Sequence, residues 1–132
     1  MKISSLASIA LVSASLTLAG CTTMADAVQA RGSGATATYQ ASFDEIWAAL
    51  PGAINDAGLK FVTANRDDRS VLAQRGMTVF SYGENVAVFV DPVEDGRSSV
   101  EVVSKKAMRT NVFAPDWSKA IFRELDKKFK RV

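Results

Sequence analysis

Two valine-rich stretches decide the fold: Asn85-Val-Ala-Val-Phe-Val-Asp91 and Ser99-Val-Glu-Val-Val-Ser-Lys105. Successive side chains of a strand point to opposite faces of a sheet, so the alternation in both stretches predicts two strands. Glu94-Asp95-Gly96 lies between them and is typical of a turn. The two strands are therefore expected to form an antiparallel hairpin.

The length of the turn sets the register of this hairpin. A two-residue Asp95-Gly96 loop would place Val90 opposite Glu101 and put a charge on an otherwise valine-lined face. A three-residue loop with Gly96 in the left-handed position instead aligns the valines. We therefore predict valine opposite valine: Val90 with Val100 and Val88 with Val102.

Period two also predicts strands before this hairpin, at residues 37–41, 59–63, 70–74 and 77–81. An amphipathic helix is expected between the first two. Ser42 and Glu45 have the spacing of a capping box at its start, and Gly58 is expected to end it. Pro51 lies in its middle and predicts a kink.

A second amphipathic helix is predicted at the C-terminus, where Asp116 is its N-cap and an apolar stripe runs to Phe129. The strand–helix–strands–helix order predicts an α+β fold. In it, an antiparallel β-sheet meander carries an N-proximal helix and a C-terminal helix packed on one face. The expected core draws on both helices and the sheet: Phe43, Trp47, Leu50, Phe61, Val88, Val102, Trp117, Ile121 and Leu125.

The first twenty residues are typical of a secretion signal, with Lys2 as their one charged residue ahead of an apolar stretch. They lead into Leu18-Ala19-Gly20-Cys21, which resembles the bacterial lipobox. The resemblance implies cleavage before Cys21, diacylation of its sulfur and acylation of the new amino terminus. The alternative is a plain signal peptide followed by a free, buried cysteine. We expect residues 1–20 to be a lipoprotein signal peptide.

Lipidation would anchor the protein to the surface of a membrane, rather than make it a membrane-spanning protein. Thr22 follows the cysteine, whereas an aspartate there resembles an inner-membrane retention signal, so the periplasmic face of the outer membrane is favoured for a Gram-negative source. Residues 22–36 have no sustained period and contain Gly32-Ser33-Gly34. We therefore predict a lipidated cysteine and flexible tether over 21–36, with a reach of about 20 Å, and a single α+β domain over 37–132.

The element order resembles that of small bacterial envelope lipoproteins of unassigned function. More distantly, it is similar to helix-grip domains in the lipoprotein subunit of the outer-membrane protein assembly machine. The stretches that carry this likeness are Ser81-Tyr82-Gly83-Glu84, Val100-Glu101-Val102-Val103-Ser104 and Asp116-Trp117. They concern turns and caps, so the resemblance implies no functional residue.

Composition excludes several kinds of chemistry. The 132 residues include no histidine and one cysteine, which excludes imidazole catalysis, disulfide frameworks and zinc or iron–sulfur sites. Ser104 and Lys106 lie two residues apart on one strand, but a lysine base would have to be buried and nothing in the sequence indicates that. The acidic residues near the hairpin tip lack the spacing of a calcium loop: Asp91, Glu94 and Asp95. We expect no catalytic residues, no metal and no cofactor.

Charge is spread unevenly along the chain. Residues 21–104 contain six Lys or Arg and eleven Asp or Glu, whereas residues 105–132 contain nine and three. The polar face of the final helix is a candidate contact surface, hereafter the cationic surface: Lys119, Arg123, Lys127, Lys128 and Lys130. Either these side chains only solvate the helix, or they meet anionic headgroups, an envelope protein or an envelope polymer. No nucleic acid partner is expected for a secreted, lipid-anchored protein.

The second face of the valine hairpin is also apolar. With both helices on one side of the sheet, it is a candidate groove for a small hydrophobic ligand or a protein partner, formed by Ala87, Phe89 and Val103. Ordinary core packing is the alternative. We expect a non-catalytic, lipid-anchored envelope lipoprotein that acts as an accessory or binding module; the alternative is a carrier of a small apolar ligand.

Overall fold

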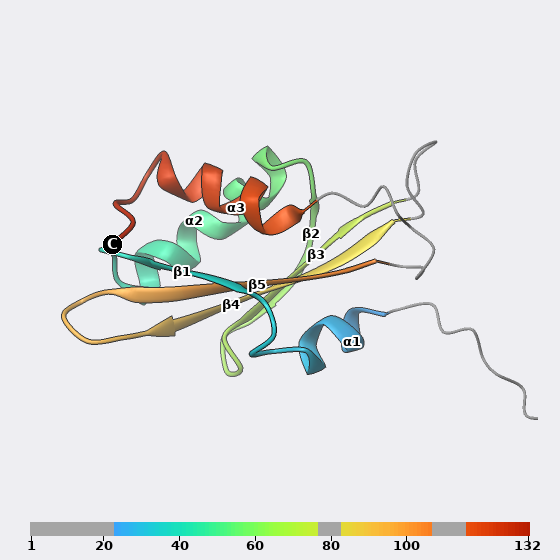
Figure 1. The fold of residues 1–132 in the computed structure, drawn as a ribbon, viewed down its shortest axis with the longest axis horizontal. Coiled ribbons are helices and arrows are strands. Elements are labelled where there is room, and N and C mark those ends of the chain that lie inside the picture. The colour runs from blue at the N-terminus through green and yellow to red at the C-terminus, as the bar shows by residue number, and fades with distance from the viewer. Residues whose placement is uncertain (1–22, 77–82, 107–115) are drawn as a thin grey trace, which may run out of the picture.

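The computed structural model describes residues 23–76, 83–106 and 116–132, which form one five-stranded sheet with helices on both faces (Figure 1). In chain order the elements are α1 (Met24–Gln29), β1 (Ala35–Tyr39), α2 (Phe43–Asp56), β2 (Lys60–Asn65), β3 (Ser70–Arg75), β4 (Glu84–Pro92), β5 (Ser98–Lys106) and α3 (Trp117–Asp126). The predicted α+β class is confirmed. The predicted strand at 77–81 lies outside the described residues.

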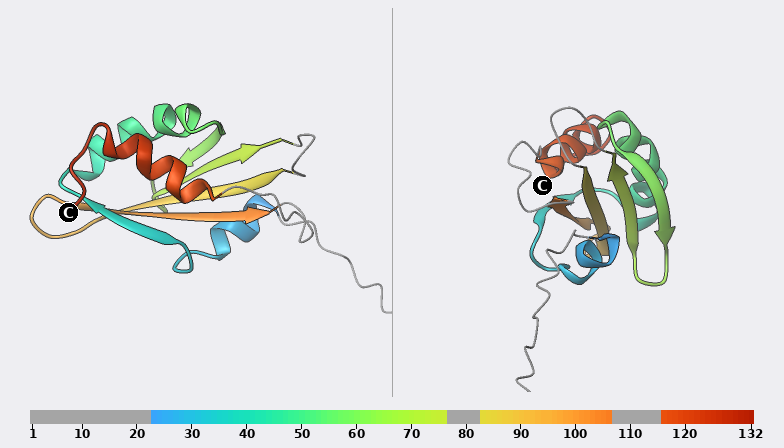
Figure 2. Two further views of the ribbon diagram at one scale, coloured as in Figure 1. Left: turned by 45° about the horizontal axis from the view of Figure 1, so that its top comes forward. Right: turned by 90° about the vertical axis from the view of Figure 1, so that its right-hand side faces the viewer.

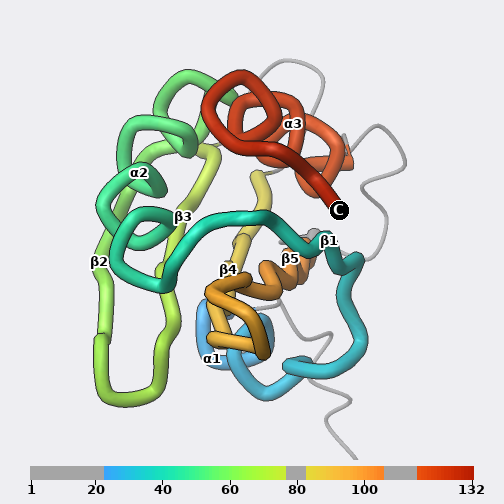
Figure 3. Tube along the Cα trace, turned by 90° about the vertical axis from the view of Figure 1, so that its left-hand side faces the viewer, coloured from blue at the N-terminus to red at the C-terminus, as the bar shows by residue number. Residues whose placement is uncertain are grey.

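Every pair of neighbouring strands is antiparallel, in the order β1-β5-β4-β3-β2. Strands β2 to β5 form the predicted meander, and β1 pairs with the last strand at one edge. Helices α2 and α3 lie together on one face, as predicted, and α1 lies on the other face (Figures 2 and 3). The sheet therefore separates two helical layers rather than supporting one.

The β4–β5 hairpin has the predicted register, with valine opposite valine: Val90 with Val100 and Val88 with Val102. The predicted three-residue loop, Glu94-Asp95-Gly96, is confirmed, because the Val93 N–H donates to the Arg97 carbonyl at 2.9 Å and Gly96 is left-handed, with φ 68°. The Arg97 N–H donates to the Glu94 carbonyl at 3.4 Å. Asp95 is left-handed as well, with φ 61°, so Glu94 to Arg97 form a tight turn inside the three-residue loop.

The two predicted helix caps are present. In α2 the Glu45 N–H donates to the Ser42 hydroxyl and the Ser42 N–H donates to the Glu45 carboxylate at 2.8 Å. The helix continues through Pro51 and is followed by Gly58, whose φ is 98°. In α3 the Asp116 side chain accepts the N–H of Ser118 at 3.1 Å.

The main core fills the space between the sheet and the α2–α3 layer. Six of the nine predicted core residues are buried there: Leu50, Val88, Val102, Trp117, Ile121 and Leu125. The other three are half-buried at its rim: Phe43, Trp47 and Phe61. A second, smaller apolar cluster lies on the opposite face of the sheet, under α1: Ala27, Ala87, Phe89 and Val103.

Candidate functional site

Helix α1 begins just after the predicted lipidation site. Its N-cap is Thr23, two residues after Cys21. The Thr23 N–H donates to the Asp26 carboxylate at 2.5 Å, and the Asp26 N–H donates back to the Thr23 hydroxyl. These hydrogen bonds hold the pKa of Asp26 below its ordinary value. Cys21 itself and the signal peptide over 1–20 lie outside the described residues.

The prediction of a flexible tether over residues 21–36 is wrong for residues 23–36. Met24–Gln29 are helical, Ala27 is fully buried, and β1 already starts at Ala35. A helix of six residues is not stable alone in water, because it has too few internal hydrogen bonds to offset the cost of nucleation. Contact with the sheet therefore stabilises it.

The predicted apolar groove is also wrong, because α1 covers it. Ala87, Phe89 and Val103 are only 0%, 1% and 2% exposed and pack against Ala27. The Arg31 guanidinium lies 4.6 Å from the centre of the Phe89 ring. The apolar second face is a small core closed by the N-terminal segment.

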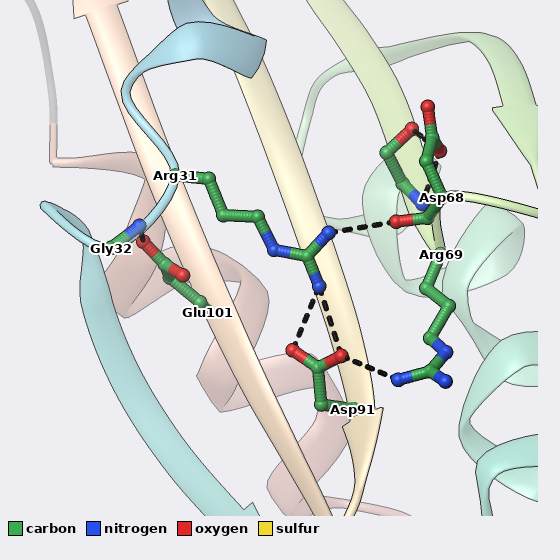
Figure 4. Close-up of polar contacts among 7 residues, drawn as sticks. Arg31, Gly32, Asp68, Arg69, Asp91 and Glu101 are labelled. Atoms are coloured by element: carbon green, nitrogen blue, oxygen red, sulfur yellow. Dashed lines mark hydrogen bonds and ion pairs between the residues drawn. The ribbon is translucent and has the colours of Figure 1, made fainter.

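A set of four residues, here called the clasp, ties this segment to the sheet: Arg31, Asp68, Arg69 and Asp91 (Figure 4). Arg31 donates to both carboxylate oxygens of Asp91 at 2.9 Å and to the Asp68 carbonyl at 2.8 Å. Arg69 donates to the same carboxylate at 2.9 Å. Burial of Asp91 opposes its ionisation, but the hydrogen bonds and charges of the two arginines outweigh it and lower the pKa of Asp91.

Glu101 on β5 holds the turn between α1 and β1. Its carboxylate accepts the N–H of Gly32 at 2.6 Å (Figure 4). The same carboxylate oxygen accepts the N–H of Gly34 at 3.0 Å. A Cβ atom at Gly34 would lie 2.4 Å from the Val102 carbonyl oxygen, so the chain can pass this close to β5 only as glycine. Residues 23–34 are thus held by β3, β4 and β5 or the turns beside them.

The structure places α3, which carries Lys119 and Arg123 of the cationic surface, on the other face of the sheet (Figure 3). All five residues of the cationic surface are exposed. Helix α3 ends at Asp126 with Lys127 as its C-cap, so the predicted extension to Phe129 is wrong. Lys128 and Lys130 therefore lie in the tail that follows the helix, rather than on its face.

Two members of the cationic surface are paired locally. Lys127 binds the Glu124 carboxylate at 2.9 Å, and the Lys119 Nζ lies 4.0 Å from Asp116. Three of the five form no ion pair with the residues that the structure describes: Arg123, Lys128 and Lys130. They are the charges available for contact with another molecule.

The tail beyond α3 is fixed to β1. The Val132 N–H donates to the Thr38 carbonyl and the Gln40 N–H donates to the Lys130 carbonyl, both at 2.9 Å. The carbonyl of Lys130 is thus held in place while its side chain stays exposed. At Lys130, the cationic surface therefore has a backbone that hydrogen bonds hold beside β1.

A buried tyrosine joins this tail to α3, and sequence reasoning did not find the arrangement. Tyr39 is fully buried and donates to the Asp126 carboxylate at 3.1 Å. Burial, followed by this hydrogen bond, raises the pKa of Tyr39 to about 12. Arg131 donates to both oxygens of Asp126, at 3.0 and 2.8 Å. The alternation of apolar residues predicted only a strand over residues 37–41.

The structure also locates the residues considered for catalysis and for metal binding. Ser104 is exposed, and within the described ranges no three His, Cys, Asp or Glu side chains are grouped to hold a metal ion. No helix among the described residues has the length and hydropathy needed to span a bilayer. Neither a protein-family model nor a curated protein matches this chain.

Proposed function

We propose that this chain is a lipid-anchored lipoprotein of the bacterial cell envelope, and that its single α+β domain is a non-catalytic accessory or binding module. The observation that carries the proposal is Leu18-Ala19-Gly20-Cys21, with the only cysteine of the chain at its last position. The periplasmic face of the outer membrane is the favoured location in a Gram-negative source, because Thr22 rather than aspartate follows the cysteine.

The docking of residues 23–34 supports this proposal. A segment that only had to connect a lipid to a domain would need no buried residue and no specific ion pairs. Here Ala27 is buried against the sheet, and Arg31 binds Asp91 and Asp68. A segment fixed in this way would hold the domain in one position relative to its anchor, which is useful for a module that presents a binding surface.

The cationic surface is the candidate for that binding role. Arg123, Lys128 and Lys130 are exposed and free of ion pairs within the described residues. The alternative function, a carrier of a small apolar ligand, has no supporting observation, because α1 covers the sheet face that would hold the ligand.

Metabolic labelling with a palmitate analogue tests the anchor. We expect the full chain to incorporate the label and stay in the membrane fraction after a salt wash. Cys21→Ala should lose both properties, whereas the matched variant Thr22→Ala should keep both. A Cys21→Ala chain that remains in washed membranes would contradict the proposal.

A further inference from the structure

Helices α1 and α3 lie on opposite faces of the sheet (Figures 1 and 3). Cys21 precedes Thr23 by two residues, which span at most about 7 Å even when fully extended. A lipid on Cys21 would therefore extend from the side of the domain that carries α1. This inference rests on the proposed lipidation of Cys21.

The α1 side has charges that are largely satisfied within the domain. Asp91 is bound by Arg31 and Arg69, and Asp26 is bound by Thr23. The helix itself adds partly or fully exposed apolar side chains: Met24, Ala25 and Val28. A short apolar helix next to an acyl anchor is suited to lie against the headgroup region of a bilayer.

Distance separates the cationic surface from that bilayer. Packed layers of secondary structure are spaced about 10 Å apart, so α3 lies about 20 Å from the layer of α1. At physiological ionic strength the Debye length is about 8 Å, so charges at that distance are largely screened. The bilayer that holds the anchor is thus a poor electrostatic partner for Arg123 on α3 and for Lys128, which directly follows the C-cap of that helix.

Helix α2, which lies next to α3, also restricts the charge pattern that a partner surface can have. Helix α2 packs beside α3, and its charged residues are all acidic and exposed: Asp44, which is ion-paired with Arg66, and also Glu45 and Asp56. A uniformly anionic surface would be attracted by the cationic surface and repelled by Glu45 and Asp56 of α2. A protein surface with an acidic patch beside basic residues matches both helices.

We propose that the anchored protein is oriented with α1 toward its own bilayer. The cationic surface then points away from that bilayer, toward an acidic patch on a partner protein in the adjacent aqueous compartment. The clasp sets the orientation, because it fixes residues 23–34 on one face of the sheet.

Fluorophores on introduced cysteines test the orientation in the lipidated full-length mature chain, since acylation blocks Cys21. Asp67→Cys places a label beside the clasp, and Lys128→Cys places one on the cationic surface; both positions are exposed. In vesicles of phosphatidylethanolamine and phosphatidylglycerol with nitroxide-labelled headgroups, we expect quenching at position 67 to exceed quenching at position 128 several-fold. Equal quenching, or stronger quenching at 128, would overturn the proposal.

A clasp variant provides the matched control. Arg31→Ala should reduce the difference between the two labels, whereas Arg97→Ala should preserve it, since the two arginine side chains are 37% and 36% exposed and only Arg31 belongs to the clasp. A difference that survives Arg31→Ala unchanged would show that the clasp does not set the orientation. A chain that fails to float with the vesicles would instead overturn the lipid anchor of the proposed function.

The partner chemistry is tested with the mature chain carrying Cys21→Ala. The probe is a helical peptide that carries a row of glutamates beside a row of lysines, and its control is a peptide of the same composition in scrambled order. We expect the patterned peptide to bind several-fold more tightly than the scrambled one, and Lys128→Glu with Lys130→Glu to remove that difference. Equal binding of the two peptides, or tighter binding to phosphatidylglycerol vesicles than to the patterned peptide, would overturn the assignment.

Discussion

Arg31 binds both carboxylate oxygens of Asp91, although sixty residues separate the two in the sequence. The contact joins the segment that follows Cys21 to the central strand β4. Both side chains are partly exposed, at 37% and 41%, so water and salt weaken the ion pair. Its role is to position α1 rather than to stabilise the whole domain.

Arg31→Ala is therefore expected to loosen α1 with little effect on the rest of the fold. Global stability in urea should fall by about 1 kcal/mol or less, while hydrogen exchange of the amides over residues 24–34 should accelerate strongly. Arg97→Ala is the control and should leave those amides unchanged. Uniform acceleration across all strands would contradict a local role.

Ala27→Glu should detach α1 completely, because it places a charge against Phe89 in a contact that excludes water. The uncovered sheet face should then bind the dye ANS. Ala25→Glu adds the same charge to the same helix at an exposed position and should bind no extra dye. Equal dye binding by both variants would count against α1 as the cover of Phe89.

Trp117→Ala should cost about 3–5 kcal/mol, since this side chain is 4% exposed between α3 and the sheet. Trp47→Ala should cost clearly less, because Trp47 is half-buried at the rim of the same core. Urea denaturation of both variants measures the difference. Equal losses would contradict the assignment of the two rings.

Stability should fall at alkaline pH through Tyr39. Its pKa is raised from 10.0 to about 12, so folding favours the protonated phenol. The stabilisation is complete below pH 10 and is lost as the pH rises through about 12. In a Tyr82→Phe background, where Tyr39 is the only tyrosine, the ultraviolet absorbance of tyrosinate should appear near pH 12. Tyr39→Phe should abolish that signal; a tyrosinate signal centred near pH 10 would contradict the burial of Tyr39.

The hairpin register could be predicted because a one-residue slip would have placed Glu101 opposite Val90 and among the valines. The caps at Ser42 and Asp116 could be predicted because both depend on residues within a few positions of each other. These features are local, or they follow from a regular period. The end of α3 was missed because the apolar spacing continues to Phe129 after the helix has stopped.

Helix α1 could not be predicted from its period, since a single fully buried side chain, Ala27, gives no stripe. The spacing of Thr23 and Asp26 was the one local signal, because it places a carboxylate where a capping box needs it. The clasp and the Tyr39–Asp126 contact join positions sixty and eighty-seven residues apart. Only the fold brings them together, and the predicted groove was wrong for the same reason.

The attachment of residues 23–34 also determines how the domain responds to force. A pull applied at Cys21 enters the described structure at Thr23, and it reaches α1 and the clasp before any strand. Beyond these contacts the load would reach β1, which is paired with β5 along its whole length. Under load the N-terminal segment should peel away first and lengthen the connection to the lipid, leaving the sheet intact and the domain folded.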